Sequence, residues 1–491
     1  MSGPFKASPP AYLIPHDEDS LGSLIRWAWE QQVSLIPRGA GTGMPGGNLG
    51  PEIVVEIGPA FGGVEVLDAQ SGRIRVGAGE VAGEVDRIAR QHGGFLPFLP
   101  SSGRWCRVGG MVANNSAGAR SFRYGAISAW VDALEGFYAW GEHFRVGLGE
   151  PSPTLFTDLH SSLEKKLPLS SDGTLAGWPP VRKNSSGYAL DRFLPSCDPA
   201  QLLVGSEGTL AFVTRADLRF PPLPDERGLA VLRAESSDAL TELALASDNL
   251  GATACEFFGK RFLKLIGPSL DPELGKMLKG SFALVLIEVT GSSDEVQSKL
   301  SSLQKLSSSG LHASSLIIRD PETADRLWAL RHATSPIIAR ESDRGRISTQ
   351  FIEDSVVPPS ALGDYLKGIE QILEGVGMDA VVFGHAGDGN VHVNPLVEVD
   401  DPDWIHRVQH TLDQVTDLVA DLGGTLSGEH GDGRLRTPLL SRIWPAHLVR
   451  GFQQVKKTLD PKGILNPGVI VPRVGQDPLE GLFPRPQRYP A

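Results

Sequence analysis

The sequence predicts an α+β protein whose loops carry an unusual share of glycine. Helical periodicity over 19–32 and 81–92 is interleaved with short apolar runs that are typical of strands. Glycine and proline number 57 and 37 among 491 residues, which is above average but below the range of low-complexity chains. A proline cluster at 220–224 (FPPLP) divides the chain, and beyond it the pattern indicates an antiparallel sheet covered by helices.

The elements before this cluster are short and separated by loops. The expected elements are a helix over 19–32, strands over 33–36, 53–57 and 72–76, and a helix over 81–92. Gly93 and Gly94 follow that last helix, as C-terminal cap glycines do. Residues 97–118 are expected to form a loop, because glycine, proline and asparagine are frequent in them.

The elements after the cluster are longer and more apolar. The expected elements are strands over 228–233 and 281–290 and helices over 237–250, 293–307, 361–375 and 405–422. From residue 475 onward the chain is rich in proline and is expected to be irregular.

Composition excludes several classes of protein. A net charge of −12 argues against nucleic acid as the main partner, because phosphate contact needs a clustered basic face. Apolar runs such as 282–287 are far shorter than the roughly 20 residues of a membrane span, and residues 1–15 contain no apolar core of a signal peptide. Three cysteines without a CxxC pair exclude an iron–sulfur cluster within the chain. We therefore expect a cytoplasmic protein.

The first glycine loop contains a misleading motif. Residues 37–47 (PRGAGTGMPGG) match GxGxxG at Gly41, Gly43 and Gly46, but residues 45–51 (PGGNLGP) cannot begin the helix that follows this motif in nicotinamide-binding folds. The loop alone fits either a flexible turn or a nest of backbone N–H groups that holds an anion. Two further glycine-rich stretches, 100–118 and 203–224, favour a long ligand lying against backbone.

Several motifs together carry a resemblance to a known family. PRGAGTG, VGGMVANNSAG with a following YG, KNSSGY (183–188) and GSEGTLA (205–211) resemble the flavin domain of the vanillyl-alcohol-oxidase superfamily. As far as LDPKGILNPG (459–468), the chain is similar to its D-2-hydroxy-acid dehydrogenase branch. This resemblance implies a two-subdomain FAD-binding domain over 1–222 and an antiparallel-sheet-plus-helices substrate (cap) domain with a metal site over 223–440. It also implies a C-terminal segment, 441–491, that returns towards the flavin.

The resemblance also implies which residues hold the cofactor. It places FAD contacts at Pro37, Arg38, Gly39, Ala40, Gly41, Thr42, Gly43, Pro100, Ser101, Ser102, Gly109, Gly110, Asn114, Asn115, Ala117, Gly118, Glu207, Gly208, Val213 and Asn466. Some family members attach flavin through a histidine in the first loop. Ala40, Thr42 and Met44 occupy that neighbourhood here, so we expect non-covalent FAD.

Two histidine motifs predict a metal centre. In residues 383–394 (FGHAGDGNVHVN) the turn-forming AGDGN segment allows His385 and His392 to meet, and residues 427–433 (SGEHGDG) add Glu429 and His430. Two histidines and a carboxylate form a catalytic metal set that leaves coordination positions open. By resemblance, His385, His392 and Glu429 bind a divalent ion, zinc or manganese, and His430 is the base.

The substrate carboxylate needs a cation. Arg331, in a helix (LWALR, 327–331) expected to end near Pro336, resembles the family's substrate arginine, and Ser335 lies one helical turn further. In a strand expected over 351–359 (FIEDSVVPP), Ile352 or Glu353 stands where many members have a lysine. The open alternatives for a replacement are Arg340, Arg344 and Arg346.

These residues suit one reaction in particular. The expected function is FAD- and metal-dependent oxidation of a D-2-hydroxy acid (D-2-hydroxyglutarate, D-lactate or glycolate) to the 2-keto acid, with hydride passing from Cα to flavin N5. The alternatives are a non-redox flavoenzyme resembling alkylglycerone-phosphate synthase and an accessory flavin subunit of an oxidase complex. Electrons then leave to a separate acceptor: a quinone, an electron-transfer or iron–sulfur protein, or oxygen. Peripheral membrane association and oligomerisation stay open.

Overall fold

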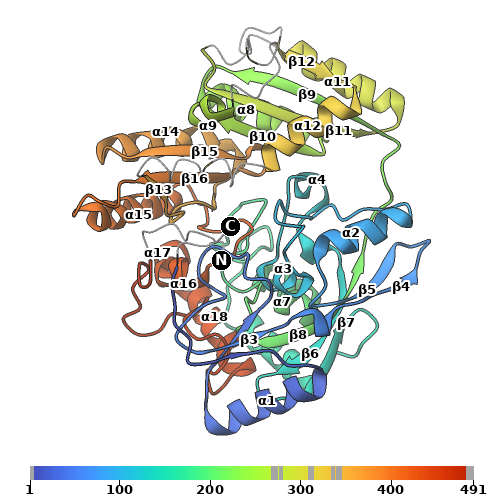
Figure 1. Ribbon diagram of the computed structural model, residues 1–491, viewed down its shortest axis with the longest axis vertical. Coiled ribbons are helices and arrows are strands. Elements are labelled where there is room, and N and C mark those ends of the chain that lie inside the picture. Colours follow the sequence, from blue (N-terminus) through green and yellow to red (C-terminus); the bar gives the residue numbers. More distant parts are fainter. Residues whose placement is uncertain are drawn as a thin grey trace, which may run out of the picture.

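The computed structural model describes residues 5–266, 275, 280–307, 315–332, 338 and 346–482. Two layered parts lie one above the other, joined by the segment between residues 219 and 226, and the C-terminal helices pack beside both (Figure 1). The predicted α+β class is confirmed. Within the described residues, no helix is both long enough and apolar enough to cross a membrane.

The first part contains two small sheets. A parallel sheet has the order β1-β3-β2, and an antiparallel sheet has the order β4-β5-β8-β6-β7. The strands are β1 (Tyr12–Leu13), β2 (Leu35–Arg38), β3 (Ile53–Glu56), β4 (Val64–Asp68), β5 (Arg73–Gly77), β6 (Val131–Tyr138), β7 (His143–Gly147) and β8 (Ala211–Arg219). The helices are α1 (Glu18–Gln31), α2 (Ala82–Gln91), α3 (Val108–Asn114), α4 (Ser121–Tyr124), α5 (Thr154–Glu164), α6 (Leu190–Ser196) and α7 (Pro199–Leu203).

Local sequence explains where the first helix begins and which face it buries. Asp17 caps the helix by accepting a hydrogen bond from Ser20 N at 2.8 Å, and the Ser20 hydroxyl lies 3.1 Å from Asp17 N in a reciprocal capping box. Leu21, Ile25 and Ala28 follow at helical spacing and are fully buried. They pack between the two sheets of the first part.

The second part is built on one large sheet. Among the described residues eight strands join, all in antiparallel pairs, in the order β12-β9-β11-β10-β15-β16-β13, with β14 also pairing with β16. The strands are β9 (Glu226–Ala234), β10 (Ala254–Gly259), β11 (Ala283–Gly291), β12 (Ser315–Ile318), β13 (Ile347–Ser348), β14 (Ser355–Val356), β15 (Asp379–His385) and β16 (Asn390–Val397). The helices are α8 (Ser237–Asn249), α9 (Lys260–Ile266), α11 (Ser293–Ser307), α12 (Pro321–His332), α14 (Leu362–Gly375) and α15 (Trp404–Asp421).

The two faces of this sheet differ in chemistry. One face is apolar and lies under α8, α11, α14 and α15 (Figure 1). The opposite face packs partly under α9 and α12 and carries polar side chains where it meets the first part. Strand β16 shows the alternation directly: Asn390, His392 and Asn394 share one face, while Val391 and Val393 fill the core on the other.

The C-terminal helices return to the first part. They are α16 (Gly433–Arg436), α17 (Leu440–Ile443) and α18 (Ala446–Leu459). Leu448, Phe452 and Val455 of α18 belong to the core of the first part, and Asn466 N donates to Leu35 O at 2.8 Å. The chain therefore closes on the strand that precedes the first glycine loop.

Most of the expected elements are present within a residue or two, and two expectations were wrong. Residues 108–114 form helix α3 inside the segment expected to be a loop, because Val108, Met111 and Val112 bury a helical face. The expected strand over 351–359 is a series of turns that reaches strand geometry only at Ser355–Val356. Pro336, near which the α12 region was expected to end, lies outside the described residues.

Candidate active site

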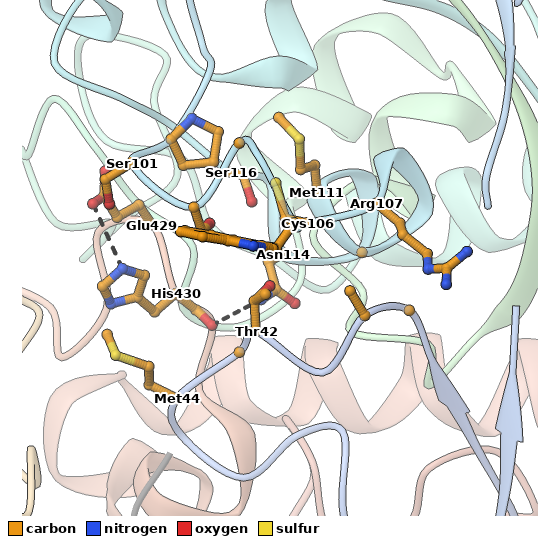
Figure 2. A pocket seen from close by; sticks show the side chains of 18 of the residues that line it. Thr42, Met44, Ser101, Cys106, Arg107, Met111, Asn114, Ser116, Glu429 and His430 are labelled. Carbon is orange, nitrogen blue, oxygen red and sulfur yellow. Dashed lines mark hydrogen bonds and ion pairs between the residues drawn. The ribbon is translucent and has the colours of Figure 1, made fainter. Parts of the chain in front are cut away.

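One cavity of about 1620 Å³ lies between the two parts of the molecule. The first and second glycine loops line it, as do the histidine motifs of the large sheet and the GEHGDG loop. Figure 2 shows Thr42, Ser101, Asn114 and His430 around the same space. The two groups of residues that the sequence singled out therefore belong to one site.

The first glycine loop offers main-chain atoms to this cavity. Gly41 and Gly46 have φ of +74° and +81°, which favours glycine at both positions. The loop leads from β2 into turns and then to β3, so no helix follows the GxGxxG match. The rejection of a nicotinamide site is thus consistent with the local structure.

The second loop and helix α3 form the facing wall. A Cβ added at Gly110 would meet no heavy atom within 4 Å, so the cavity is open at that position. A Cβ at Gly109, in contrast, would lie 2.8 Å from the Cβ of Ala78. Gly109 therefore allows α3 to pack closely against Ala78, and Gly110 leaves room for a ligand.

Most of the expected FAD contacts line the cavity. They are Pro37, Arg38, Gly39, Ala40, Gly41, Thr42, Gly43, Pro100, Ser101, Ser102, Gly109, Gly110, Asn114, Ala117, Gly118, Glu207, Gly208 and Val213. Asn115 and Asn466 lie outside the lining. Asn115 accepts from Ser128 N at 3.2 Å, and Asn466 donates to Gly47 O at 2.9 Å and to Glu207 O at 2.8 Å, so both amides brace loops.

The cavity fits a long flavin nucleotide in size and in wall chemistry. Its lining at the first part is main chain and small side chains, with space left at Gly110. Cys106 also lines this wall, but the pKa of its thiol is raised to about 11 by burial. The thiol is therefore not ionised at neutral pH.

Three imidazoles converge on one carboxylate oxygen at the other end. The Nε2 atoms of His385, His392 and His430 lie 3.3, 3.5 and 3.6 Å from Oε1 of Glu429. The β15–β16 hairpin brings His385 and His392 together: it pairs Phe383 with His392, so both histidines project from the same face of the sheet. The ligand atoms of His385, His392 and Glu429 all lie within 4.8 Å of one another, a spacing that suits one metal ion.

Each imidazole is anchored through its other nitrogen. Nδ1 of His385 lies 2.6 Å from Glu256 Oε1, Nδ1 of His392 lies 2.9 Å from the Glu353 carbonyl oxygen, and Nδ1 of His430 lies 2.9 Å from Glu353 Oε1. These oxygens accept, so each Nδ1 carries the proton and donates it. The Nε2 atoms consequently face the cavity, as metal ligation and proton exchange both require.

Charges around the imidazoles set their protonation. Burial alone would lower the pKa of His430, but the carboxylates of Glu353, Asp354 and Glu429 together outweigh it and raise that pKa to about 10. Likewise Glu256 raises the pKa of His385 against the effect of burial. Burial would raise the pKa of Glu429, but Lys183 and His385 hold it well below its usual range.

Buried polar residues hold the GEHGDG loop in place. Asp354 Oδ2 accepts from Glu429 N at 3.1 Å and from His430 N at 2.9 Å, and Lys183 Nζ lies 3.1 Å from Glu429 Oε2. Asn114 of α3 donates to the His430 carbonyl oxygen at 3.1 Å (Figure 2). Lys183 therefore occupies one Glu429 oxygen, and the other is directed at the three imidazoles.

Arg331 lines the same cavity from α12. Its Nε donates to Glu256 Oε2 at 2.6 Å, and its guanidinium lies 4.9 Å from the centre of the Phe383 ring. Glu256 thus links Arg331 with His385, at 0% exposure. Ser335, Arg340 and Arg344 lie outside the described residues.

Sequence reasoning did not assign a role to the residues that anchor the site. They are Glu256, Glu353, Asp354, Lys183 and Arg436. Glu353 was noticed only as a departure from a lysine; it is 2% exposed, and Arg436 donates to it at 2.6 Å. A signal did exist for Glu256, since a charged residue inside the apolar run ACEFFG is rare unless it is paired.

Comparisons with known proteins support a flavin site. Residues 9–147 match the family described as FAD binding domain, and residues 223–470 match FAD linked oxidases, C-terminal domain. The chain is 29% identical over 459 residues to D-lactate dehydrogenase of Archaeoglobus fulgidus, covering 93% of this chain and 90% of that protein. It is 27% identical over 468 residues to glycolate oxidase subunit GlcD of Bacillus subtilis, covering 94% and 89%.

Solved structures share the fold. A structure of alkyldihydroxyacetonephosphate synthase matches with a TM-score of 0.63 and 16% identity, covering 93% of this chain and 76% of that one. This likeness concerns the fold alone.

Proposed function

Because the chain belongs to the FAD-linked oxidases, we propose that it oxidises a D-2-hydroxy acid to the 2-keto acid with FAD and a divalent metal ion. The observation that carries this proposal is the convergence of three Nε2 atoms on Glu429, in the cavity lined by the glycine loops. The names of the relatives, D-lactate dehydrogenase and glycolate oxidase subunit, support the substrate class.

Each side chain has a role in this reaction. Arg331 binds the substrate carboxylate, and Glu256 fixes the angle of its guanidinium. His385, His392 and Glu429 would hold the metal ion, whose positive charge opposes the carboxylates that raise the pKa of His430. His430 would then accept the hydroxyl proton at Nε2. Glu353 keeps His430 in the tautomer that presents this atom.

The bound groups supply chemistry that side chains lack. A divalent ion lowers the pKa of a bound hydroxyl, and FAD accepts hydride from the adjacent carbon. The chain would position the donor carbon by holding the carboxylate and the hydroxyl at two fixed points.

Anaerobic flavin reduction tests the proposal. The purified protein, supplied with Zn²⁺ or Mn²⁺, is mixed with D-lactate, glycolate and D-2-hydroxyglutarate, and flavin absorbance is followed. We expect bleaching with at least one acid and none with L-lactate. Failure of every acid would contradict the proposal.

The two alternative functions, a non-redox transferase and an accessory flavin subunit, predict different experimental results. A non-redox transferase on the same fold would keep its flavin oxidised with every hydroxy acid, so the absorbance assay separates the two. An accessory subunit would tolerate His430→Ala without loss of turnover in its complex, whereas we expect turnover to fall at least about 100-fold.

A further inference from the structure

Lys183 is a buried cation where the two parts of the molecule meet. It begins the segment KNSSGY (183–188), a motif to which the proposed reaction assigns no step. Its side chain is 4% exposed, and its ammonium lies 3.1 Å from Glu429 Oε2 and 3.3 Å from Asp388 Oδ2. Both carboxylates are buried as well. A lysine is rarely buried to this extent unless it is paired, so the two carboxylates and the ammonium form one charged cluster.

The segment that carries this lysine is fixed to the loop that carries Glu429. The Ser185 hydroxyl donates to the carbonyl oxygen of Gly428 at 3.0 Å. Gly187 N donates to Asp432 Oδ2 at 2.8 Å. These contacts lie on both sides of Glu429 in the loop, so they hold the ammonium within reach of its carboxylate.

Asp388 connects the same ammonium to the histidine hairpin. It lies in the AGDGN turn between His385 and His392. Its second oxygen, Oδ1, lies 3.8 Å from Nε of Arg182, which also pairs with Asp248 at 2.6 Å. The lysine, which belongs to the first part, therefore pairs with one carboxylate from each of the two histidine motifs.

The two oxygens of Glu429 have separate partners. Oε1 lies 3.3–3.6 Å from the Nε2 atoms of the three imidazoles, one of which is labelled in Figure 2, and Oε2 pairs with the ammonium. A carboxylate can bind a metal ion through one oxygen or through both. Glu429 lines the cavity, whereas Lys183 lies outside the lining. The lysine consequently acts on the cavity through this carboxylate.

We propose that Lys183 is a positioning residue: its ammonium holds Oε2 of Glu429, so that the carboxylate offers one oxygen to the divalent ion and leaves a coordination position for the substrate. The inference rests on the proposed function and adds a residue to it. A charge-assisted hydrogen bond at Oε2 competes with a metal bond at the same oxygen. Two imidazoles and one carboxylate oxygen leave room for a substrate, whereas a carboxylate that binds through both oxygens fills part of that room.

Mn²⁺ binding to the FAD-loaded, metal-free enzyme tests the inference. Lys183→Met keeps the length of the side chain and removes its charge. Lys166→Met, at an exposed lysine that bonds to Gln454, is the control. The dissociation constant comes from the EPR signal of free Mn²⁺, and the relaxation rate of water protons reports the positions that stay open on the bound ion. Anaerobic flavin reduction by the best hydroxy acid is measured in parallel.

The expected result has opposite signs for affinity and for activity. Lys183→Met should bind Mn²⁺ at least about 10-fold more tightly, because a positive charge is removed and Oε2 of Glu429 becomes available to the ion. Water-proton relaxation per bound ion should fall, and flavin reduction should slow at least about 10-fold. Lys166→Met should change none of these. Weaker Mn²⁺ binding or unchanged relaxation in folded Lys183→Met would overturn the inference.

A second variant is measured in case the first does not fold. Lys183→Met combined with Asp388→Asn removes one buried charge of each sign, so the charge balance of the cluster is kept. The same results support or overturn the inference in this variant. The native enzyme separates the two proposals. If it binds Mn²⁺ and its flavin is reduced, a contrary result in the variants overturns the inference alone; if neither occurs, the proposed function falls as well.

Discussion

The glycine loops and the histidine site share one cavity but are built in opposite ways. At the loops, side chains are missing, and Gly110 leaves open space in the wall. At the histidine site, side chains converge, and each Nδ1 is anchored on Glu256 or Glu353. The loops accommodate a ligand because they lack side chains, whereas the histidine site acts through side chains that are held in fixed positions. Substitutions in the loops should therefore affect FAD binding, whereas substitutions in the histidine site should affect turnover and metal binding.

The largest expected effect comes from removing one convergent imidazole. His392→Ala should lower kcat/KM by about 1,000-fold or more, because the hydroxyl loses its metal activation. Bound metal, measured by elemental analysis, should fall while FAD content stays constant. His406→Ala, at an exposed histidine of α15, is the control and should change neither. Loss of FAD together with metal would contradict the expectation that the glycine loops bind FAD independently of the histidine site.

An anchor behind the base should have a smaller effect. Glu353→Gln keeps an oxygen for Nδ1 of His430 but removes the charge, so kcat should fall about 100-fold with little change in KM. Since Glu353 raises the pKa of His430, its loss lowers that pKa, and the acidic limb of the kcat profile should move to lower pH. Asp379→Asn, at the other end of β15, serves as control. An unmoved profile would argue against this anchor.

Two neighbouring glycines separate the effect of ligand space from the effect of packing within the second glycine loop. Gly110→Leu fills open space, so FAD affinity should fall at least about 10-fold while the Tm of the flavin-free protein is unchanged. Gly109→Ala creates a contact of 2.8 Å with the Cβ of Ala78 and should cost about 1–3 kcal/mol of stability. Titration of FAD and thermal melts distinguish them. The reverse pattern would mean that Gly110, not Gly109, is the packing position.

The smallest expected effect lies where the two regions join. Glu207 accepts from Asp432 N at 2.6 Å and from Gly433 N at 3.0 Å, and burial, followed by Asp432, raises its pKa from 4.5 to about 8. The folded state then holds a proton that the unfolded state releases, so stability declines as pH rises from about 4.5 to about 8. Glu207→Gln should remove this decline. Melting curves at pH 5 and pH 8.5 should show the variant gaining a few degrees relative to wild type at the higher pH.

The sequence predicts the second part well because its periodicity is strong. The alternation of Asn390, His392 and Asn394 with valines already places both polar groups and core on one strand. The turn-forming AGDGN segment supports the hairpin that joins His385 to His392. The residues of the proposed metal set can therefore be predicted from two short motifs.

The anchors were not predictable in the same way, because their contacts are distant in sequence. Glu256 meets His385 across 129 residues, and Glu353 meets His430 across 77. No local pattern encodes such pairs. Helix α3 was missed for another reason: its glycines favour a loop, and tertiary packing of Val108, Met111 and Val112 outweighs that preference.

The contacts that join the two parts of the molecule also constrain when the site can form during synthesis. Asn114 meets the His430 carbonyl across 316 residues, and Asn466 holds Gly47 across 419. During synthesis, the first loop and the histidine hairpin leave the ribosome long before Asn466 does. The nascent chain therefore carries both halves of the site before the contact of Asn466 with Gly47 can hold the first loop in place. Loading of the cofactor is expected to follow completion of the chain.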